Sequence, residues 1–192
     1  MEETPLFIAC ECGYAIIVKY LVEHGADISK TNEFCETPLF SACRNGHEEV
    51  VKCLVQLGAD INKANKFNLT PLMMACIKDN VSLVKYLIEC GADVNYASDV
   101  GTPLFYSCKY KNEAVAKCLI ELGADINKED RFGNTTLTNA CCYRKNKEVV
   151  KLIVELGADI NKTNRAGKTP LIVAREGKNE EIMKYLVEHG AI

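Results

Sequence analysis

The stretch TPLFSACRNGHEEVVKCLVQLGADINK, residues 37–63, contains the signals for two short helices in succession. Thr37 is a good N-cap because its hydroxyl can accept a hydrogen bond from a free backbone N–H, and Pro38 fits the first helical position. The NG dipeptide that follows is typical of a turn, and the spacing of apolar residues in VVKCLV predicts a second helix. Gly58 can end that helix in the left-handed conformation. The stretch therefore predicts a helix–turn–helix unit followed by a loop.

The same signals occur six times along the chain. The capping threonines are Thr4, Thr37, Thr70, Thr102, Thr135 and Thr169, and the closing glycines are Gly25, Gly58, Gly91, Gly123, Gly157 and Gly190. We place repeats 1 to 6 at residues 1–31, 32–64, 65–97, 98–129, 130–163 and 164–192. One helix pair cannot bury its own apolar face, so the units must stack. We therefore expect a single all-α repeat solenoid over residues 1–192.

The combined pattern of TPL, AC, VVK and GADINK resembles the ankyrin repeat, which has a period of about 33 residues and a TPLHxA signature. The resemblance covers the whole chain and implies a β-hairpin finger followed by an antiparallel helix pair in each repeat. It also implies a curved solenoid whose fingers and first helices line a concave face. Members of this family serve as inhibitors, adaptors and targeting modules, so the fold names no partner.

The chain departs from the family pattern at two kinds of position. The histidine after TPL is replaced by Phe7, Phe40, Met73, Phe105, Thr138 and Ile172. We expect apolar packing to replace the bond of that histidine everywhere except at Thr138. The glycine of the finger becomes Cys35 in repeat 2 and Asn68 in repeat 3, and asparagine tolerates a positive φ better than cysteine does.

Cysteines recur once per repeat, at Cys10, Cys43, Cys76, Cys108 and Cys141. Neighbouring packed helices are roughly 8–10 Å apart, whereas a disulfide needs Cα atoms within about 7 Å. We therefore interpret this cysteine column as buried thiols that take the place of alanine. The last repeat has Arg175 at the column position, which suits a closing repeat with a polar outer face.

Composition and motifs exclude several classes of function. The net charge is −3 and the pI is near 5.7, which argues against a general nucleic-acid binder. The chain has neither an apolar run of about 18 residues nor a secretory signal, so we expect a cytoplasmic or nuclear protein. It has no phosphate-binding glycine loop, nucleophile elbow or paired CxxC zinc pattern. We expect no enzymatic activity, no metal and no cofactor.

A column of lysines recurs on the second helices, at Lys19, Lys52, Lys85, Lys117, Lys151 and Lys184. A Glu or Gln follows each lysine four residues later. Such neighbours usually form a solvated outer face, which we favour over a phosphate-binding stripe.

The candidate partner site combines finger tips with the ends of the first helices, which we call the palm. The finger residues are Phe34, Phe67, Leu69 and Phe132, and the palm residues are Lys78, Lys109, Tyr110, Lys111, Tyr143, Arg144 and Lys145. Arg44 and Lys178 extend this basic strip. Exposed apolar residues in line indicate a partner site, and Tyr and Arg are enriched at interface hot spots. Alternatively, the phenylalanines pack against neighbouring fingers and the lysines are a scatter on solvated helix ends.

The resulting hypothesis is a monomeric module that binds a protein or peptide, of acidic character, on its concave face. One alternative is a spacer or scaffold segment of a larger protein, and another is a nucleic-acid-binding solenoid along the lysine column or palm. Substitution of the palm lysines would leave every interaction of a spacer intact. Affinity for nucleic acid would fall steeply with salt.

Repeat 5 and repeat 1 are irregular. Repeat 5, in TTLTNACCYRKNKEV, residues 135–149, has Thr136 in place of the proline and one extra residue in its turn. We expect the least rigid helix start there, and an adapted palm position. In repeat 1, Ile16 stands where the other repeats have Glu49, Ser82, Ala114, Glu148 and Glu181, from which we expect the chain to continue upstream in a longer protein.

Overall fold

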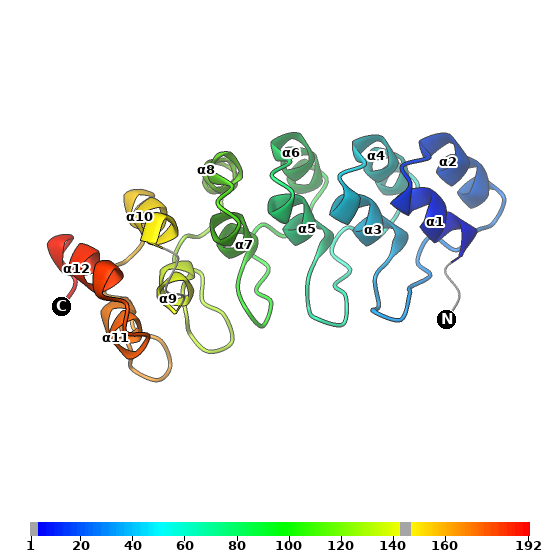
Figure 1. Cartoon of the computed structure of the whole chain (residues 1–192). Helices are drawn as coiled ribbons and strands as arrows, with labels where there is room; N and C mark the ends of the chain where they lie inside the picture. The colour runs from blue at the N-terminus through cyan, green and yellow to red at the C-terminus, as the bar shows by residue number, and fades with distance from the viewer. Residues whose placement is uncertain (1–3, 143–146) are drawn as a thin grey trace. The chain divides into compact units, whose positions relative to one another are not determined.

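The computed structural model describes residues 4–142 and 147–192, and these contain twelve α-helices in six pairs (Figure 1). The first helices of the repeats are α1 (Pro5–Glu11), α3 (Pro38–Asn45), α5 (Pro71–Ile77), α7 (Pro103–Lys109), α9 (Thr136–Cys141) and α11 (Pro170–Glu176). The second helices are α2 (Ala15–Glu23), α4 (Glu48–Gln56), α6 (Val81–Glu89), α8 (Glu113–Glu121), α10 (Lys147–Glu155) and α12 (Glu180–Glu188). The helix pairs confirm the expected repeats of an all-α solenoid.

The chain forms two compact units, Met1–Asp93 and Val94–Ile192. In the first unit, α1 packs on α3 and α3 on α5, while α2 packs on α4. In the second unit, α7 packs on α9 and α9 on α11, while α10 packs on α12. In both units, therefore, first helices stack on first helices and second helices on second helices.

All six first helices begin with the predicted threonine cap. Each threonine Oγ1 accepts a hydrogen bond from the backbone N–H three residues later, at 3.2–3.4 Å. The closing glycines have φ between 89° and 96°, as predicted for left-handed capping residues. At the position after TPL, where the family signature has histidine, Phe7, Phe40, Met73 and Phe105 are buried. Thr138 keeps a polar contact, because its hydroxyl lies 3.2 Å from that of Thr135.

The cysteine column is buried in all five repeats, and all eleven cysteines are free thiols. Burial raises the pKa of Cys10 and of Cys108 to about 12. It raises the pKa of Cys43 and Cys141 in the same direction. Arg175, at the same position in repeat 6, is exposed. These observations confirm that the column is structural and that the last repeat carries a polar side chain there.

The β-hairpin character of the fingers is not confirmed, because the described residues contain no β-strand. Each finger is a tight turn closed by a side chain. In repeat 3, Asn65 Oδ1 accepts hydrogen bonds from the backbone N–H groups of Phe67 and Leu69, both at 3.0 Å. Asn32, Asp130 and Asn164 make the equivalent pair of bonds in repeats 2, 5 and 6. Because these side chains satisfy the finger N–H groups locally, no strand ladder is needed to pair them.

The asparagine of the GADIN segment links consecutive repeats within each unit. Asn62 Nδ2 donates to the carbonyl oxygen of Gly91 at 3.0 Å, and Asn62 Oδ1 accepts from the N–H of Asp93 at 2.9 Å. Asn95 and Asn161 each make the same two bonds in the second unit. The recurring Asn is therefore a hydrogen-bonded link between one loop and the next.

Candidate partner-binding surface

The finger tips of repeats 2 and 3 form one aromatic cluster in the first unit. Phe34 is 38% exposed and Phe67 is 57% exposed. Lys66 lies between them, with its ammonium 3.9 Å from the centroid of the Phe34 ring and 5.2 Å from that of Phe67. The backbone N–H of Lys66 also donates to the carbonyl oxygen of Phe34 at 2.9 Å. Both aromatic rings thus keep an accessible surface, and the ammonium of one lysine lies close to both of them.

The other predicted residues of the first unit have less distinctive surroundings. Leu69 is half-buried, so only part of its side chain could contact a partner. Lys78 is exposed at the C-cap of α5, as expected for a palm residue. Arg44 is not a free cation. Its guanidinium pairs with Glu36 at 2.8 Å and lies 3.5 Å from Glu11, and these two carboxylates offset its charge.

The second unit has a related finger in repeat 5. Phe132 is 51% exposed, and the guanidinium carbon of Arg131 lies 4.7 Å from the centroid of its ring. Arg131 also pairs with Asp99 at 2.9 Å, which holds the guanidinium in place. The N–H of Arg165 donates to the carbonyl oxygen of Phe132 at 3.1 Å. Neighbouring finger tips are therefore joined in the same way as in repeats 2 and 3.

The end of α7 provides the second predicted group of this unit. Tyr110, at the C-cap of the helix, is 49% exposed. Lys109 is half-buried, and its ammonium lies 5.9 Å from the Phe105 ring centroid and 6.0 Å from that of Tyr110. Lys111 is exposed and has a φ of 63°. The predicted Tyr143, Arg144 and Lys145 lie outside the described residues.

Two residues of these clusters were absent from the prediction, namely Lys66 and Arg131. Both directly precede a finger phenylalanine in the sequence, in NKF and DRF. That pairing of a cation with the next aromatic residue was a signal that could have identified them. Both cations lie close enough to a phenylalanine ring for cation–π attraction.

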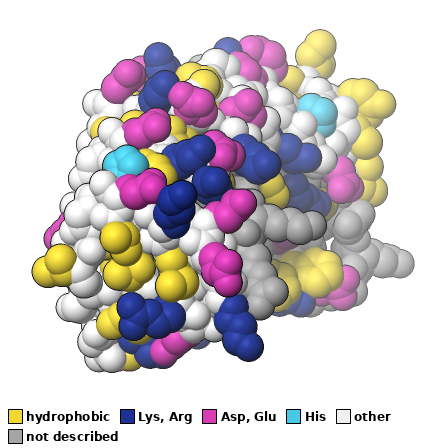
Figure 2. Space-filling view, turned by 60° about the vertical axis from the view of Figure 1, so that its left-hand side comes forward, with side chains coloured by type: hydrophobic (Ala, Val, Ile, Leu, Met, Phe, Trp, Pro, Cys, Tyr) yellow, Lys and Arg dark blue, Asp and Glu magenta, His cyan; other side chains and the backbone are white. Residues whose placement is uncertain are grey.

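Five of the six lysines of the column form ion pairs with glutamates on their own helix. Lys19 and Lys184 pair with the glutamate four residues later, at 3.9 Å in both cases. Lys52, Lys117 and Lys151 pair instead with a glutamate three or four residues earlier, at 2.5–3.0 Å. On the face shown in Figure 2, basic and acidic side chains are intermixed. This mixture of charges favours the solvated outer face over a phosphate-binding surface.

Neither a catalytic nor a metal centre is evident in the part of the chain that the structure describes. No group of three or more His, Cys, Asp or Glu side chains there is arranged to hold a metal ion. Burial raises the pKa of six cysteines, which opposes formation of a reactive thiolate; they are Cys10, Cys43, Cys53, Cys108, Cys141 and Cys142. Among the described helices, none has both the length and the apolar character required of a membrane span.

The repeated helix pairs, their threonine caps and their glycine ends define a helical repeat protein. A family model described as ankyrin repeats (3 copies) aligns with residues 1–65, 58–130 and 124–192. The chain therefore belongs to the ankyrin repeat family, whose members are generally non-catalytic protein–protein interaction modules. The comparison with curated proteins found no match.

Proposed function

We propose that the chain binds a partner protein through its finger tips and palm, and that the bound segment is an acidic peptide. The observation that carries this proposal is the cluster of Phe34, Lys66 and Phe67. Aromatic rings that are exposed yet held in place supply contact area at a low cost in conformational entropy. The lysine between them provides a charge that an acidic segment could pair with.

The second unit offers a further cluster of the same chemistry. Phe132 lies beside Arg131, and Tyr110 lies beside Lys109 and Lys111. Aromatic residues next to cations thus recur in both units, on fingers and on a first-helix end. We propose that each unit contributes its own contacts, with Leu69 and Lys78 at the border of the first cluster. Tyr143, Arg144 and Lys145 belong to the same proposal as an extension of the palm.

The proposal can be tested by selecting binders from a random peptide display library with the intact chain. We expect the selected peptides to be rich in Asp and Glu. Phe67→Ala and Tyr110→Ala, made separately, should each weaken the affinity of these peptides by about 2 kcal/mol, the threshold for a hot-spot residue. Calorimetric titration would provide the affinities.

Val187→Ala provides a matched control, because Val187 is 57% exposed on α12, outside both clusters. It should leave peptide affinity unchanged. Peptides without acidic enrichment, or peptides that bind both variants as tightly as the original chain, would contradict the proposal and favour a spacer role. Equal thermal unfolding of all variants would show that the losses reflect binding rather than folding.

A further inference from the structure

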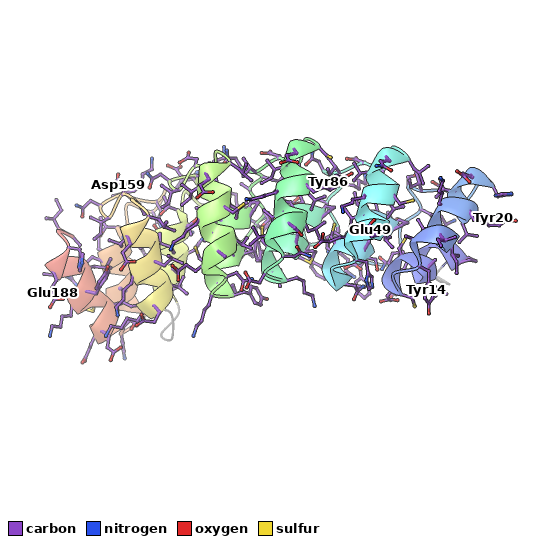
Figure 3. The ribbon with its side chains drawn as sticks, turned by 90° about the horizontal axis from the view of Figure 1, so that it is seen from above. Tyr14, Tyr20, Glu49, Tyr86, Asp159 and Glu188 are labelled. Atoms are coloured by element: carbon purple, nitrogen blue, oxygen red, sulfur yellow. The ribbon has the colours of Figure 1, made fainter. Side chains whose placement is uncertain are left out.

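Repeat 1 exposes a broad apolar face on the side of α1 and α2 that is turned away from repeat 2. The large exposed side chains of this face are Ile8, Tyr14, Ile16, Ile17 and Tyr20. Figure 3 shows Tyr20 on the side of α2 directed away from α4. Ile16 is 87% exposed, and the other four are between 47% and 59% exposed. We call this surface the leading face.

Equivalent residues of later repeats show what such a face normally contacts. The counterparts of Ile17 are Val50, Leu83, Val149 and Ile182, all at most 3% exposed. The counterpart of Tyr14 in repeat 2 is His47, whose Nε2 lies 2.8 Å from the carbonyl oxygen of Glu11 in repeat 1. These positions are thus interface positions wherever a neighbour lies against them.

A groove runs beside the leading face. It has a volume of about 310 Å³ and is lined by Thr4, Pro5, Leu6, Leu21, Ala26, Asp27 and Lys30. Pro5 is exposed there, whereas Pro38 and Pro71 at the same position are buried. None of the five leading-face side chains lines this groove, so a specific contact is favoured by the apolar area of the face itself.

Ile16 distinguishes this face from those of the other repeats. Its counterparts Ser82 and Glu181 stay exposed and make polar contacts with the preceding repeat. Ser82 donates to Glu48 at 2.5 Å, and Glu181 pairs with Lys147 at 3.6 Å. An isoleucine can make neither contact. Ser82 and Glu181 meet charged residues in the first turns of α4 and α10. The surface that covers Ile16 should instead be apolar.

Among the second helices, α2 itself offers such an apolar first turn. It has no acidic residue there, a property that it shares with α6, whereas α4, α8, α10 and α12 each have at least one glutamate. The two charged residues of α2, Lys19 and Glu23, pair with each other at 3.9 Å and so leave the helix without net charge. The leading face can therefore meet a copy of itself without repulsion between like charges.

We propose that the leading face is the interface of a homodimer, in which α1 and α2 of one chain pack against the same helices of a second copy. A two-fold arrangement uses the same patch on both subunits and closes at two chains. Full burial of one large aromatic side chain removes roughly 150–250 Å² from water, and Tyr14 and Tyr20, which are 56% and 59% exposed, can each supply a little over half of that. The roughly 800 Å² per partner of a standard interface therefore also needs the three isoleucines and a rim of neighbouring residues from α1 and α2. This proposal differs from the monomer expected from the sequence.

Sedimentation equilibrium of the full chain across the micromolar range tests the dimer. The mass should rise from 21.3 kDa toward twice that value and go no further. Ile16→Glu places two charges in the interface of each dimer and should raise the dissociation constant at least about tenfold. Glutamate already occupies this helix position at Glu49, Glu148 and Glu181, so the variant should fold normally.

Two further variants complete the experiment. Ile16→Ser copies Ser82 and should weaken the dimer in the same direction, which protects the test if Ile16→Glu folds poorly. Val187→Glu introduces the same charge at an exposed apolar position on α12 and should leave dimerisation unchanged. The proposal is overturned by a chain that stays monomeric throughout, by growth beyond two chains, or by a dimer insensitive to both Ile16 variants.

Discussion

The ammonium of Lys66 lies 3.9 Å from the centroid of the Phe34 ring, and the backbone N–H of the same lysine donates to the carbonyl oxygen of Phe34 at 2.9 Å. These residues belong to neighbouring fingers and are separated by 32 positions in the sequence. One residue therefore joins two finger tips through its backbone and its side chain. The finger tips of repeats 2 and 3 are therefore held together by a hydrogen bond and a cation–π contact and are not independent loops.

Replacement of Lys66 by alanine should remove the cation–π contact with Phe34. We expect a loss of about 0.5–1 kcal/mol in the free energy of unfolding, the range for exposed contacts of this kind. Affinity for acidic peptides should also fall, with a weaker dependence on salt. Urea unfolding and calorimetric titration would measure the two effects. Lys63→Ala, an exposed lysine of the preceding loop segment, is the control and should change neither quantity.

Cys35 occupies the finger position with a φ of 57°, where a side chain is strained. Cys35→Gly should therefore stabilise the chain by about 1 kcal/mol, measured as a higher urea midpoint. Asn68 has a φ of 59° at the same position of repeat 3, but asparagine tolerates this region. Asn68→Gly should accordingly give a smaller gain. An equal or greater gain at Asn68 would show that backbone strain is not the cause.

Position 136 should tolerate the proline found in the other repeats, and this substitution should stabilise the folded chain. The hydroxyl of Thr136 is buried without a hydrogen-bond partner in the structure. Thr135 before it is extended, with φ −82° and ψ 171°, which suits a residue that precedes proline. We expect Thr136→Pro to raise stability by about 1 kcal/mol. The reverse change, Pro103→Thr in α7, should lower stability, and thermal unfolding of both variants would check the pair.

The buried thiols predict a loss of stability at alkaline pH. The pKa of Cys108 is raised from 9.0 to about 12 because burial disfavours the thiolate, so the folded chain keeps a proton that the unfolded chain releases. The stabilisation is complete below pH 9 and is lost between pH 9 and 12 as pH rises. The slope for one thiol is about 1.4 kcal/mol per pH unit. Cys108→Ala should reduce the slope of unfolding free energy against pH by that amount, whereas Val187→Ala, which removes no titratable group, should not.

The Asn62 link predicts a local effect on the following loop. Asn62→Ala removes its two hydrogen bonds, to Gly91 and from Asp93, and should cost about 1–2 kcal/mol of unfolding free energy. Hydrogen exchange at the Asp93 amide should become faster, since that N–H loses its acceptor. Unchanged exchange at Asp93 would mean that the bond is not maintained in solution.

Much of the fold was predictable because its determinants are local. A threonine, a proline, an apolar period and a glycine lie within 22 consecutive residues in five of the six repeats, such as Thr37 to Gly58, and each acts on its own backbone. Repeat 5 lacks the proline and has one residue more. The burial of the cysteine column followed from its recurrence once per repeat. The β-hairpin fingers were the part of the expectation that the described residues did not confirm. There, side chains such as Asn65 take the N–H groups that a strand ladder would use.

The candidate surface was less predictable because it depends on neighbours across repeats. Arg44 looked like a palm cation, yet its charge is offset by Glu36 and by Glu11. Glu11 belongs to the preceding repeat, 33 positions away in the sequence, so the sequence did not reveal this pair. Lys66 looked like an ordinary loop lysine, yet it is placed beside two aromatic rings. No periodicity states which side chain of one repeat faces which side chain of the next.

The sequence by itself determined the number of repeats, their helix boundaries, their caps and the buried thiol column, because each depends on residues a few positions apart. Only the tertiary structure decided which charges are offset, which phenylalanines remain accessible and which apolar side chains of repeat 1 are exposed. These properties depend on the packing of one repeat against another. Stacking brings together side chains about one repeat apart, and their identities vary although the repeat itself does not.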